Sequence, residues 1–266
     1  MSGALAILAG HGTLPQVLAG ANADALFVSF EGVDVTVPLP RHFAASFNQF
    51  GNLFETLHAA GITTVTFAGA MTRPALNPAA FDHKTVALAP RLMAAMAGGD
   101  DGLLREIVAV FEEQGFDVKG AHQVMPDLVA EAGLLAGQDL DAADMADAKR
   151  GMEILNALSD VDVGQGVVVV NGLCLGVETL QGTDAMLGFV AATPAHLRQT
   201  GGVFVKAAKT GQDLRVDMPA IGPDTVTSVA AANLGGIVIA AGRVMILERA
   251  KTIAAIEAAG LFLLAI

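Results

Sequence analysis

Short apolar runs that end in glycine alternate with helical segments through the first half of the chain, and this alternation most constrains the fold. Residues 4–9 form a continuous apolar run that leads into Gly10-His11-Gly12, and Pro15 follows shortly after. Such runs are typical of strands buried on both faces of a parallel sheet. Proline is favoured in the first turn of a helix. The sequence therefore predicts a strand, a glycine turn and a helix in that order.

The same pattern recurs to about residue 125. Further strands are expected at 26–30, 63–68 and 116–119, with helices at 51–60 and from Asp100-Asp101 onward. Regular alternation of strands and helices favours an α/β fold with a parallel sheet. The first half is therefore predicted to be a Rossmann-like domain.

The second half follows a different, mixed α/β pattern. The runs 166–170 and 173–177 flank Asn171-Gly172, a pair typical of a type I′ hairpin turn. The runs 236–239 and 244–247 flank an Ala-Gly pair and suggest a second hairpin. Other strands are expected at 202–207 and 261–265, and helices at 141–158, 182–192, 223–232 and 250–259. We therefore divide the chain into a Rossmann-like nucleotide-contacting domain (1–132), a linker (133–140) and a C-terminal catalytic domain (141–266).

Charge and composition argue against nucleic-acid partners. The 266 residues carry a formal net charge of -12 and contain no Trp or Tyr, whereas nucleic-acid binders present basic faces and stacking rings. The most apolar stretch, 228–246, contains Asn233 and Arg243 and falls short of the roughly 20 apolar residues of a membrane span. Cys174 lies in an apolar run and is expected to be a small buried hydrophobe. We expect a cytoplasmic protein with at most peripheral contact at the inner membrane.

Two glycine-containing loops are candidates for nucleotide contacts. Gly10 and Gly12 begin a dinucleotide fingerprint, but Pro15 stands where its third glycine belongs, which argues against a full NAD site. Backbone N–H groups of such a turn still suit a phosphate; the alternative is a simple tight turn. Thr72 and Arg73 follow the strand at 63–68, and Arg73 either holds a phosphate or is a solvated loop residue.

The densest polar cluster runs from Lys206 to Asp224. Two prolines and a glycine restrict the path from Asp217 to Asp224, and the cluster also contains Lys206, Lys209, Asp213 and Arg215. Carboxylates beside cations suit phosphoryl chemistry, because acids bind a divalent ion or orient water while bases neutralise phosphate oxygens. The alternative role for Asp224 is that of a helix cap.

A second polar cluster precedes the helix expected at 182–192. Glu178 and Asp184 are candidate metal ligands, the alternatives being a surface acid and a helix cap. Gln165 lies between two glycines and is either a substrate contact or a turn residue.

Taken in order, these motifs resemble the UDP-2,3-diacylglucosamine pyrophosphatases of lipid A biosynthesis, the LpxI family. The resemblance covers nearly the whole chain. The chain departs from the family pattern at Gly188, where a basic residue is expected. The matching segments are 8–15, 69–74, Asp100-Asp101, 162–165, Val177-Glu178, 182–187, Lys206, 213–219 and 221–226.

The resemblance implies hydrolysis of UDP-2,3-diacylglucosamine to UMP and 2,3-diacylglucosamine 1-phosphate (lipid X), with water attacking the β-phosphorus. It also implies Mg²⁺ as cofactor and a homodimer. Asp224, Lys206 and Asp217 are the expected catalytic residues. Asp224, Asp184 and Glu178 are the expected metal ligands, with Asp217 and Asp213 as competing candidates. The expected substrate contacts are Gly10, Gly12, Thr72, Arg73, Asp101, Gln165, Thr183, Lys209, Arg215 and Thr225.

Two other classes of function are weighed against this one. A non-catalytic nucleotide-sugar or lipid-binding protein agrees with the incomplete glycine motif. An NAD-linked oxidoreductase is the weakest hypothesis, because Pro15 breaks the fingerprint and Glu31 is the only acid near the end of the second strand.

Overall fold

The computed structural model describes residues 4–71, 76–97, 100–197 and 201–266. The chain forms two compact units. The N-terminal unit consists of Met1–Pro126 together with Asp213–Asp217, and the C-terminal unit of Asp127–Gln212 with Met218–Ile266. The chain therefore passes from one unit to the other three times.

The N-terminal unit contains a five-stranded parallel sheet in the order β3-β2-β1-β4-β5. This is the strand order of a Rossmann fold, with the order reversing between β1 and β4. The predicted fold class of the first half is thus confirmed. Its strands are β1 (Ala4–Ala9), β2 (Leu26–Phe30), β3 (His42–Ala45), β4 (Ile62–Ala68) and β5 (Asp117–Lys119). Its helices are α1 (Leu14–Ala21), α2 (Phe50–Ala59), α3 (His83–Ala97), α4 (Asp100–Glu113) and α5 (Ala121–Val124).

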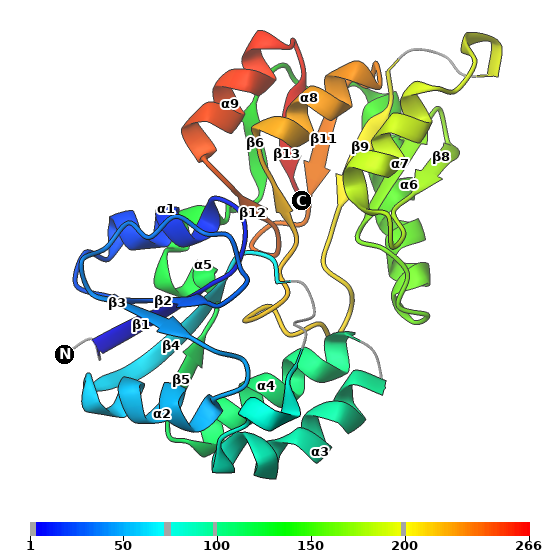
Figure 1. The fold of residues 1–266 in the computed structure, drawn as a ribbon. Coiled ribbons are helices and arrows are strands. Elements are labelled where there is room, and N and C mark those ends of the chain that lie inside the picture. The colour runs from blue at the N-terminus through cyan, green and yellow to red at the C-terminus, as the bar shows by residue number, and fades with distance from the viewer. Residues whose placement is uncertain (1–3, 72–75, 98–99, 198–200) are drawn as a thin grey trace. The chain divides into compact units, whose positions relative to one another are not determined.

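Helices cover both faces of this sheet. Figure 1 shows α1 and α5 on one face and α2 on the other. Phenylalanines dominate the α2 side of the core; the rings of Phe54 and Phe111 meet edge to face, with centroids 5.2 Å apart. This geometry is favoured for aromatic pairs and adds to the burial of apolar area.

The loops that follow β1 and β4 are joined to each other by backbone hydrogen bonds. His11 and Ala70 exchange two of these bonds as an isolated antiparallel bridge. A Cβ atom on Gly10 would lie 2.4 Å from the carbonyl oxygen of Ala70. Glycine is therefore required at position 10 by the approach of another backbone segment of the protein itself.

The C-terminal unit contains a six-stranded mixed sheet in the order β6-β13-β11-β9-β7-β8. The central strands β13, β11 and β9 are parallel to one another. β6 pairs antiparallel with β13, β7 pairs antiparallel with β9, and β8 pairs antiparallel with β7. Its strands are β6 (Gly133–Ala136), β7 (Gly166–Val170), β8 (Leu173–Val177), β9 (Val203–Lys206), β11 (Gly236–Ile239) and β13 (Phe262–Ala265). Its helices are α6 (Ala142–Ser159), α7 (Gly182–Ala191), α8 (Pro223–Ala231) and α9 (Arg249–Ala258).

One of the two predicted hairpins is present. Asn171 and Gly172 both have positive φ values, 49° and 79°, as a type I′ turn between β7 and β8 requires. Cys174 lies on β8, at the edge of the sheet, and is exposed, so the expectation that it is buried is wrong. The hairpin predicted from 236–239 and 244–247 is wrong. β11 instead lies between β9 and β13, while β12 (Met245–Ile246) pairs in parallel with β10 (Ala220–Ile221).

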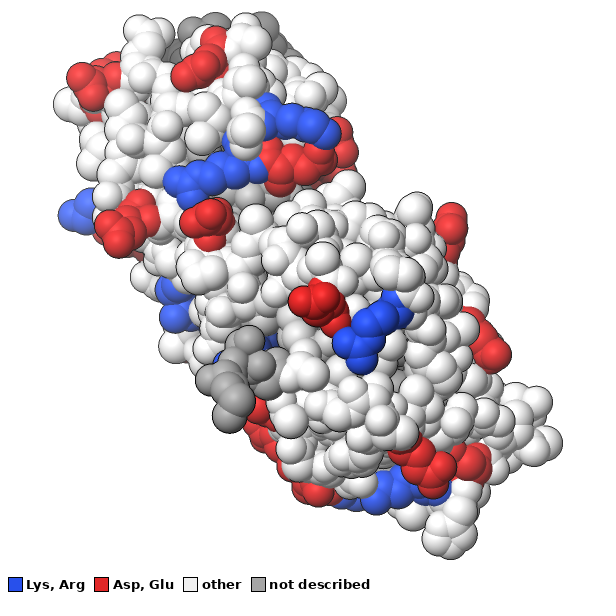
Figure 2. Space-filling model, turned by 90° about the vertical axis from the view of Figure 1, so that its left-hand side faces the viewer, with Lys and Arg blue, Asp and Glu red and all other residues white. Residues whose placement is uncertain are grey.

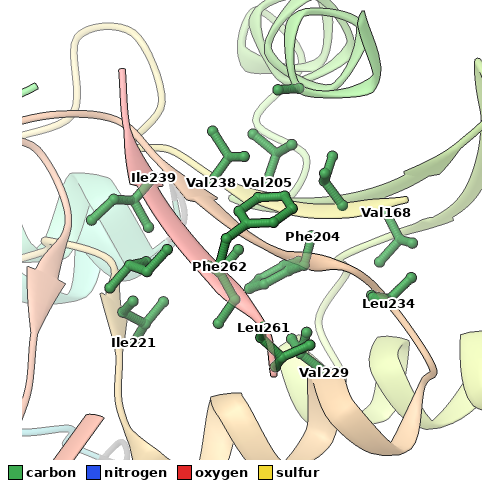
Figure 3. Close-up of a cluster of buried hydrophobic side chains, with 14 of the residues drawn as sticks. Val168, Phe204, Val205, Ile221, Val229, Leu234, Val238, Ile239, Leu261 and Phe262 are labelled. Carbon is green, nitrogen blue, oxygen red and sulfur yellow. The ribbon is translucent and has the colours of Figure 1, made fainter. Parts of the chain in front are cut away.

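The core of the C-terminal unit is aliphatic, with two phenylalanines. Figure 3 shows Phe204 and Phe262 among the branched side chains Val229, Leu234 and Leu261. All four residues of β9 are buried, including Lys206 at its end. A charged side chain in such a place needs a partner.

The predicted linker is wrong. Gly133–Ala136 forms strand β6, which pairs with β13 at the edge of the mixed sheet, and the boundary between the units falls earlier, between Pro126 and Asp127. The glycines of this segment suggested a linker, but apolar Leu134 and Leu135 lie between them in an edge strand. In the described part of the chain, no helix is both long enough and apolar enough to cross a membrane.

Candidate functional site

The carboxyl ends of the parallel strands in the C-terminal unit bring several predicted site residues to one edge. β9 ends at Lys206, and the antiparallel strand β7 begins beside it at Gly166. The backbone oxygen of Gln165 accepts a hydrogen bond from Ala207 N at 2.9 Å, so Gln165 is at the same edge. Ligands in open α/β sheets characteristically bind at this edge.

Lys206, Thr183 and Glu178 form a connected polar cluster at this edge. Lys206 Nζ donates to Thr183 Oγ1 at 2.5 Å, and Thr183 Oγ1 donates to Glu178 Oε1 at 2.7 Å. Lys206 Nζ also lies 3.5 Å from Glu178 Oε2. Only 7% of the Lys206 side chain and 14% of the Glu178 side chain are exposed. The cluster is thus an ion pair largely removed from water.

Two successive residues of β9, Val205 and Lys206, show which helix covers each face of the sheet. A Cβ on Gly151 of α6 would meet the side chain of Val205, whereas Lys206 reaches Thr183 of α7. Successive strand residues point to opposite faces, so α6 and α7 cover opposite faces of the sheet. Lys206 is therefore on the α7 side.

Asp224 lies in the first turn of α8. Gly222 is the N-cap, and its N–H donates to Thr225 Oγ1 at 3.3 Å. The alternative that Asp224 caps the helix is therefore wrong. Its side chain is exposed and makes no hydrogen bond or ion pair with another described residue. Thr225 is occupied in the helix cap, and its predicted contact with substrate remains a prediction.

Asp184 has a corresponding place in α7. Gln181 is the N-cap of this helix, and Asp184 is exposed in its first turn. Helix α8 leads into β11, so it runs opposite to the parallel strands and begins at their carboxyl edge. α7 follows β8, which is parallel to β9 because both pair antiparallel with β7. Both helices thus direct their N-termini, which favour anions, to one edge.

The predicted metal ligands do not share one compact site in the described structure. Among the described residues, no group of three or more His, Cys, Asp or Glu side chains could hold a metal ion together. Mg²⁺ commonly binds one or two carboxylates, substrate phosphates and water rather than an all-protein cage. Exposed Asp224 and Asp184 suit this kind of binding, while Glu178 is engaged by Lys206 and Thr183.

The remaining cations of the Lys206–Asp224 cluster have carboxylate partners of their own. Lys209 pairs with Asp162 in the C-terminal unit. Arg215 belongs to the N-terminal unit, as do Asp213 and Asp217. Neighbours in sequence are therefore divided between the two units, which the sequence pattern did not reveal.

We call residues 213–217 the strap. Arg215 binds Asp213 through Nε (2.9 Å to Oδ1) and Nη2 (2.7 Å to Oδ2), and its Nη1 donates to Glu112 Oε1 of α4 at 2.7 Å. The hydrogen bonds from Arg215 lower the pKa of Asp213 below its ordinary value, against the effect of burial. Val216 packs on the phenylalanine-rich core. These contacts hold the strap on the N-terminal unit.

Replacing Arg215 with methionine is expected to lower the free energy of unfolding by about 1–3 kcal/mol at pH 7, because hydrogen bonds to charged groups are lost. Asp213 has a depressed folded-state pKa, so its stabilising effect is complete above the unfolded value of about 3.9 and disappears as pH falls through the folded value. In denaturant titrations the difference from wild type should therefore stay constant from pH 7 to about pH 5 and shrink as the pH is lowered further.

The control for this substitution is Arg150→Met, which removes an ion pair with Glu153 whose side chains are both about half exposed. Its expected cost is at most about 0.5 kcal/mol. Equal effects of the two substitutions would contradict the role of Arg215 in holding the strap.

The predicted contacts of the N-terminal unit are only partly described. Gly10 has a packing role at the bridge to Ala70. Gly12 adopts a φ of 95°, with open space where a Cβ would lie. Thr72, Arg73 and the side chain of Asp101 lie outside the described residues.

Charges of both signs are interspersed on the surface. On the face drawn in Figure 2, blue Lys and Arg side chains mostly lie beside red Asp and Glu side chains. Each described cation of the Lys206–Asp224 cluster likewise has an acidic partner.

Two glycines next to Gln165 pack closely against Glu178, a contact that the sequence pattern did not predict. A Cβ on Gly164 would lie 2.1 Å from the backbone oxygen of Glu178, and a Cβ on Gly166 would lie 2.8 Å from Glu178 Oε2. The Gly-Gln-Gly pattern was a signal for close packing, but the sequence could not identify its partner.

A Rossmann-like unit combined with a mixed-sheet unit, whose carboxyl edge holds a buried lysine and two helix N-termini, defines a two-unit α/β protein. The chain belongs to the LpxI family. Residues 4–128 match the family model of the LpxI N-terminal domain, and residues 131–264 match that of the LpxI C-terminal domain. The resemblance seen in the sequence motifs is confirmed.

A curated relative covers the same extent of chain. The UDP-2,3-diacylglucosamine pyrophosphatase LpxI of Caulobacter vibrioides is 36% identical, in an alignment that includes 98% of this chain and 97% of the relative. The similarity therefore extends through both units and includes the strap.

Proposed function

We propose that this protein hydrolyses the diphosphate of UDP-2,3-diacylglucosamine to UMP and 2,3-diacylglucosamine 1-phosphate, as a step of lipid A biosynthesis. The observation that carries the proposal is the similarity to a pyrophosphatase of this specificity along nearly the entire chain. The lysine and the two helix N-termini at the carboxyl edge of the C-terminal unit support it, because a diphosphate is the most anionic part of such a substrate.

In the proposed reaction, the oxygen of a water molecule attacks the β-phosphorus. The new P–O bond forms as the bond from the β-phosphorus to the bridging oxygen breaks, so that UMP leaves with that oxygen. The water gives up a proton, and the exposed carboxylate of Asp224 is the proposed acceptor or orienting group. Asp217 is retained as a further catalytic candidate.

Negative charge builds on the phosphate oxygens during this reaction. Lys206 is held at the carboxyl edge of β9, and the first turns of α7 and α8 offer backbone N–H groups near the same edge. Fixed cations and N–H dipoles stabilise such developing charge more than water does, because they need no reorientation. Gln165, Thr183, Lys209, Arg215 and Thr225 remain proposed substrate contacts, with the structural partners given above.

We further propose a requirement for a divalent cation, Mg²⁺. Asp224 and Asp184 are the exposed carboxylates that would hold it together with the substrate's phosphate oxygens. When bound, such an ion neutralises phosphate charge and makes a bound water more acidic. We also propose that the protein is a cytoplasmic homodimer that meets the inner membrane only peripherally, through its lipid substrate.

The proposal is tested by incubating the protein with UDP-2,3-diacylglucosamine and Mg²⁺ in ¹⁸O-labelled water. We expect UMP to be released, with the label in the lipid 1-phosphate, and excess EDTA to stop the release. Label in UMP would show attack at the α-phosphorus instead. Substrate that is bound but recovered unchanged would identify a binding protein and contradict the proposal.

A further inference from the structure

Glu178 is held in a fixed position by the protein around it. Its backbone N–H donates to Gly166 O at 2.8 Å. Gly164, which has a φ of 62°, leaves room for the backbone oxygen of Glu178, and Gly166 leaves room for its carboxylate. A side chain at either position would fill that space. A side chain at position 164 would meet the backbone of Glu178, and one at position 166 would meet the carboxylate of Glu178 and the ring of Phe204. The two glycines therefore define where this carboxylate lies.

Both oxygens of this carboxylate face protein groups. Oε1 accepts a hydrogen bond from Thr183 Oγ1, and Oε2, which is buried and has no hydrogen-bond partner among the described residues, lies 3.5 Å from the ammonium of Lys206. A divalent ion would need a carboxylate oxygen at about 2.0–2.6 Å. A divalent ion on Oε2 would therefore lie beside an ammonium whose charge has the same sign and repels it, whereas the ammonium by itself already neutralises the carboxylate.

Thr183 completes the arrangement. A hydroxyl has one proton to donate and lone pairs to accept with. The Thr183 hydroxyl donates a hydrogen bond to Glu178 and accepts one from Lys206 Nζ at 2.5 Å. The orientation of this hydroxyl is therefore fixed by both neighbours. Lys206 is thereby restrained at two points, by the hydroxyl and by the carboxylate.

We infer that Glu178 and Thr183 are positioning residues that hold the Lys206 ammonium toward the phosphates of the substrate, and that Glu178 is not a metal ligand. This inference rests on the proposed function. It replaces the metal role that the sequence suggested for Glu178 and assigns Thr183 to Lys206 instead of directly to substrate. The metal-binding role proposed above then falls to Asp224 and Asp184.

Glu178→Gln separates the two roles, because glutamine keeps the shape and one oxygen but removes the charge. We expect binding of the product 2,3-diacylglucosamine 1-phosphate, measured by calorimetry in EDTA, to weaken about 10-fold and the rate of UMP release to fall about 10–100-fold, as for other supporting residues. The Mg²⁺ concentration that gives half-maximal activity should stay within about 2-fold of wild type.

Thr183→Val should reproduce these losses, since it keeps the shape but removes the hydroxyl, and Thr183→Ser should recover most of them. Glu153→Gln, at an exposed position on α6, controls for the loss of one negative charge. This set also covers the case in which Glu178→Gln does not fold, which circular dichroism would reveal.

Unchanged product binding in EDTA, together with activity that returns when Mg²⁺ is raised at least 10-fold, would overturn the inference and make Glu178 a metal ligand. Normal binding and turnover in both Glu178→Gln and Thr183→Val would also overturn it. If the wild-type protein releases no UMP, the proposed function itself fails, whatever the variants do.

Discussion

Replacing Asp224 with asparagine or alanine should lower the rate of UMP release by about 10²–10⁴-fold, the range expected when a group that accepts or orients the attacking proton is lost. Asp224 projects from the first turn of α8 and makes no bond with another described side chain that would explain its presence structurally. The loss should therefore fall on turnover, measured by chromatography of UMP, with little change in product binding.

The fold should tolerate this substitution. Exposed positions without special contacts usually change stability by at most about 0.5 kcal/mol, so the melting curve of the variant should overlay that of wild type. Asp160→Asn, at an exposed acid just after α6, is the matched control and should keep wild-type activity. Turnover by Asp224→Asn within a few-fold of wild type would remove Asp224 from the mechanism.

Replacing Lys206 with methionine should affect both activity and stability. Loss of one preorganised group that stabilises transition-state charge costs about 10²–10³-fold in rate. The same substitution leaves the carboxylate of Glu178 largely buried without its cation. Breaking a buried pair in this way costs about 3 kcal/mol, at the lower end of the usual range because Glu178 keeps some exposure.

The double variant Lys206→Met with Glu178→Gln distinguishes these two effects. Removing both charges should restore most of the stability, since a neutral buried pair carries no uncompensated charge. The activity should stay at the level of Lys206→Met, because the cation is still missing. Denaturant unfolding and UMP release measured on the four proteins of this cycle provide the check. Recovery of activity in the double variant would show that Lys206 does not act on the substrate.

The sequence predicted which residues belong to the candidate site better than it predicted which of them contact one another. Lys206 and Asp224 were found because charged residues stood beside strand ends and restricted turns. The partner of Lys206 was not found, since Glu178 precedes it by 28 positions in the chain and reaches it through the pairing of β7, β8 and β9. Lys209 and Arg215 are close in sequence but belong to different units, the C-terminal and the N-terminal unit respectively.

The sequence by itself determined the local elements. Unbroken apolar runs specified the buried strands, Asn171-Gly172 specified the type I′ turn through its tolerance of positive φ, and Pro223 began α8. These depend on contacts within a few residues, which are readable from a single chain.

Only the tertiary structure decided which segments pair and which charges meet. β12 pairs with β10 and not with β11, and residues 133–136 form an edge strand and not a linker. The strap belongs to the N-terminal unit, although the residues on both sides of it in the sequence belong to the C-terminal unit. Each outcome depends on strand pairing and on the burial of ionised groups beside distant partners. Many alternative pairings satisfy the same local pattern, and the packing of the whole chain selects among them.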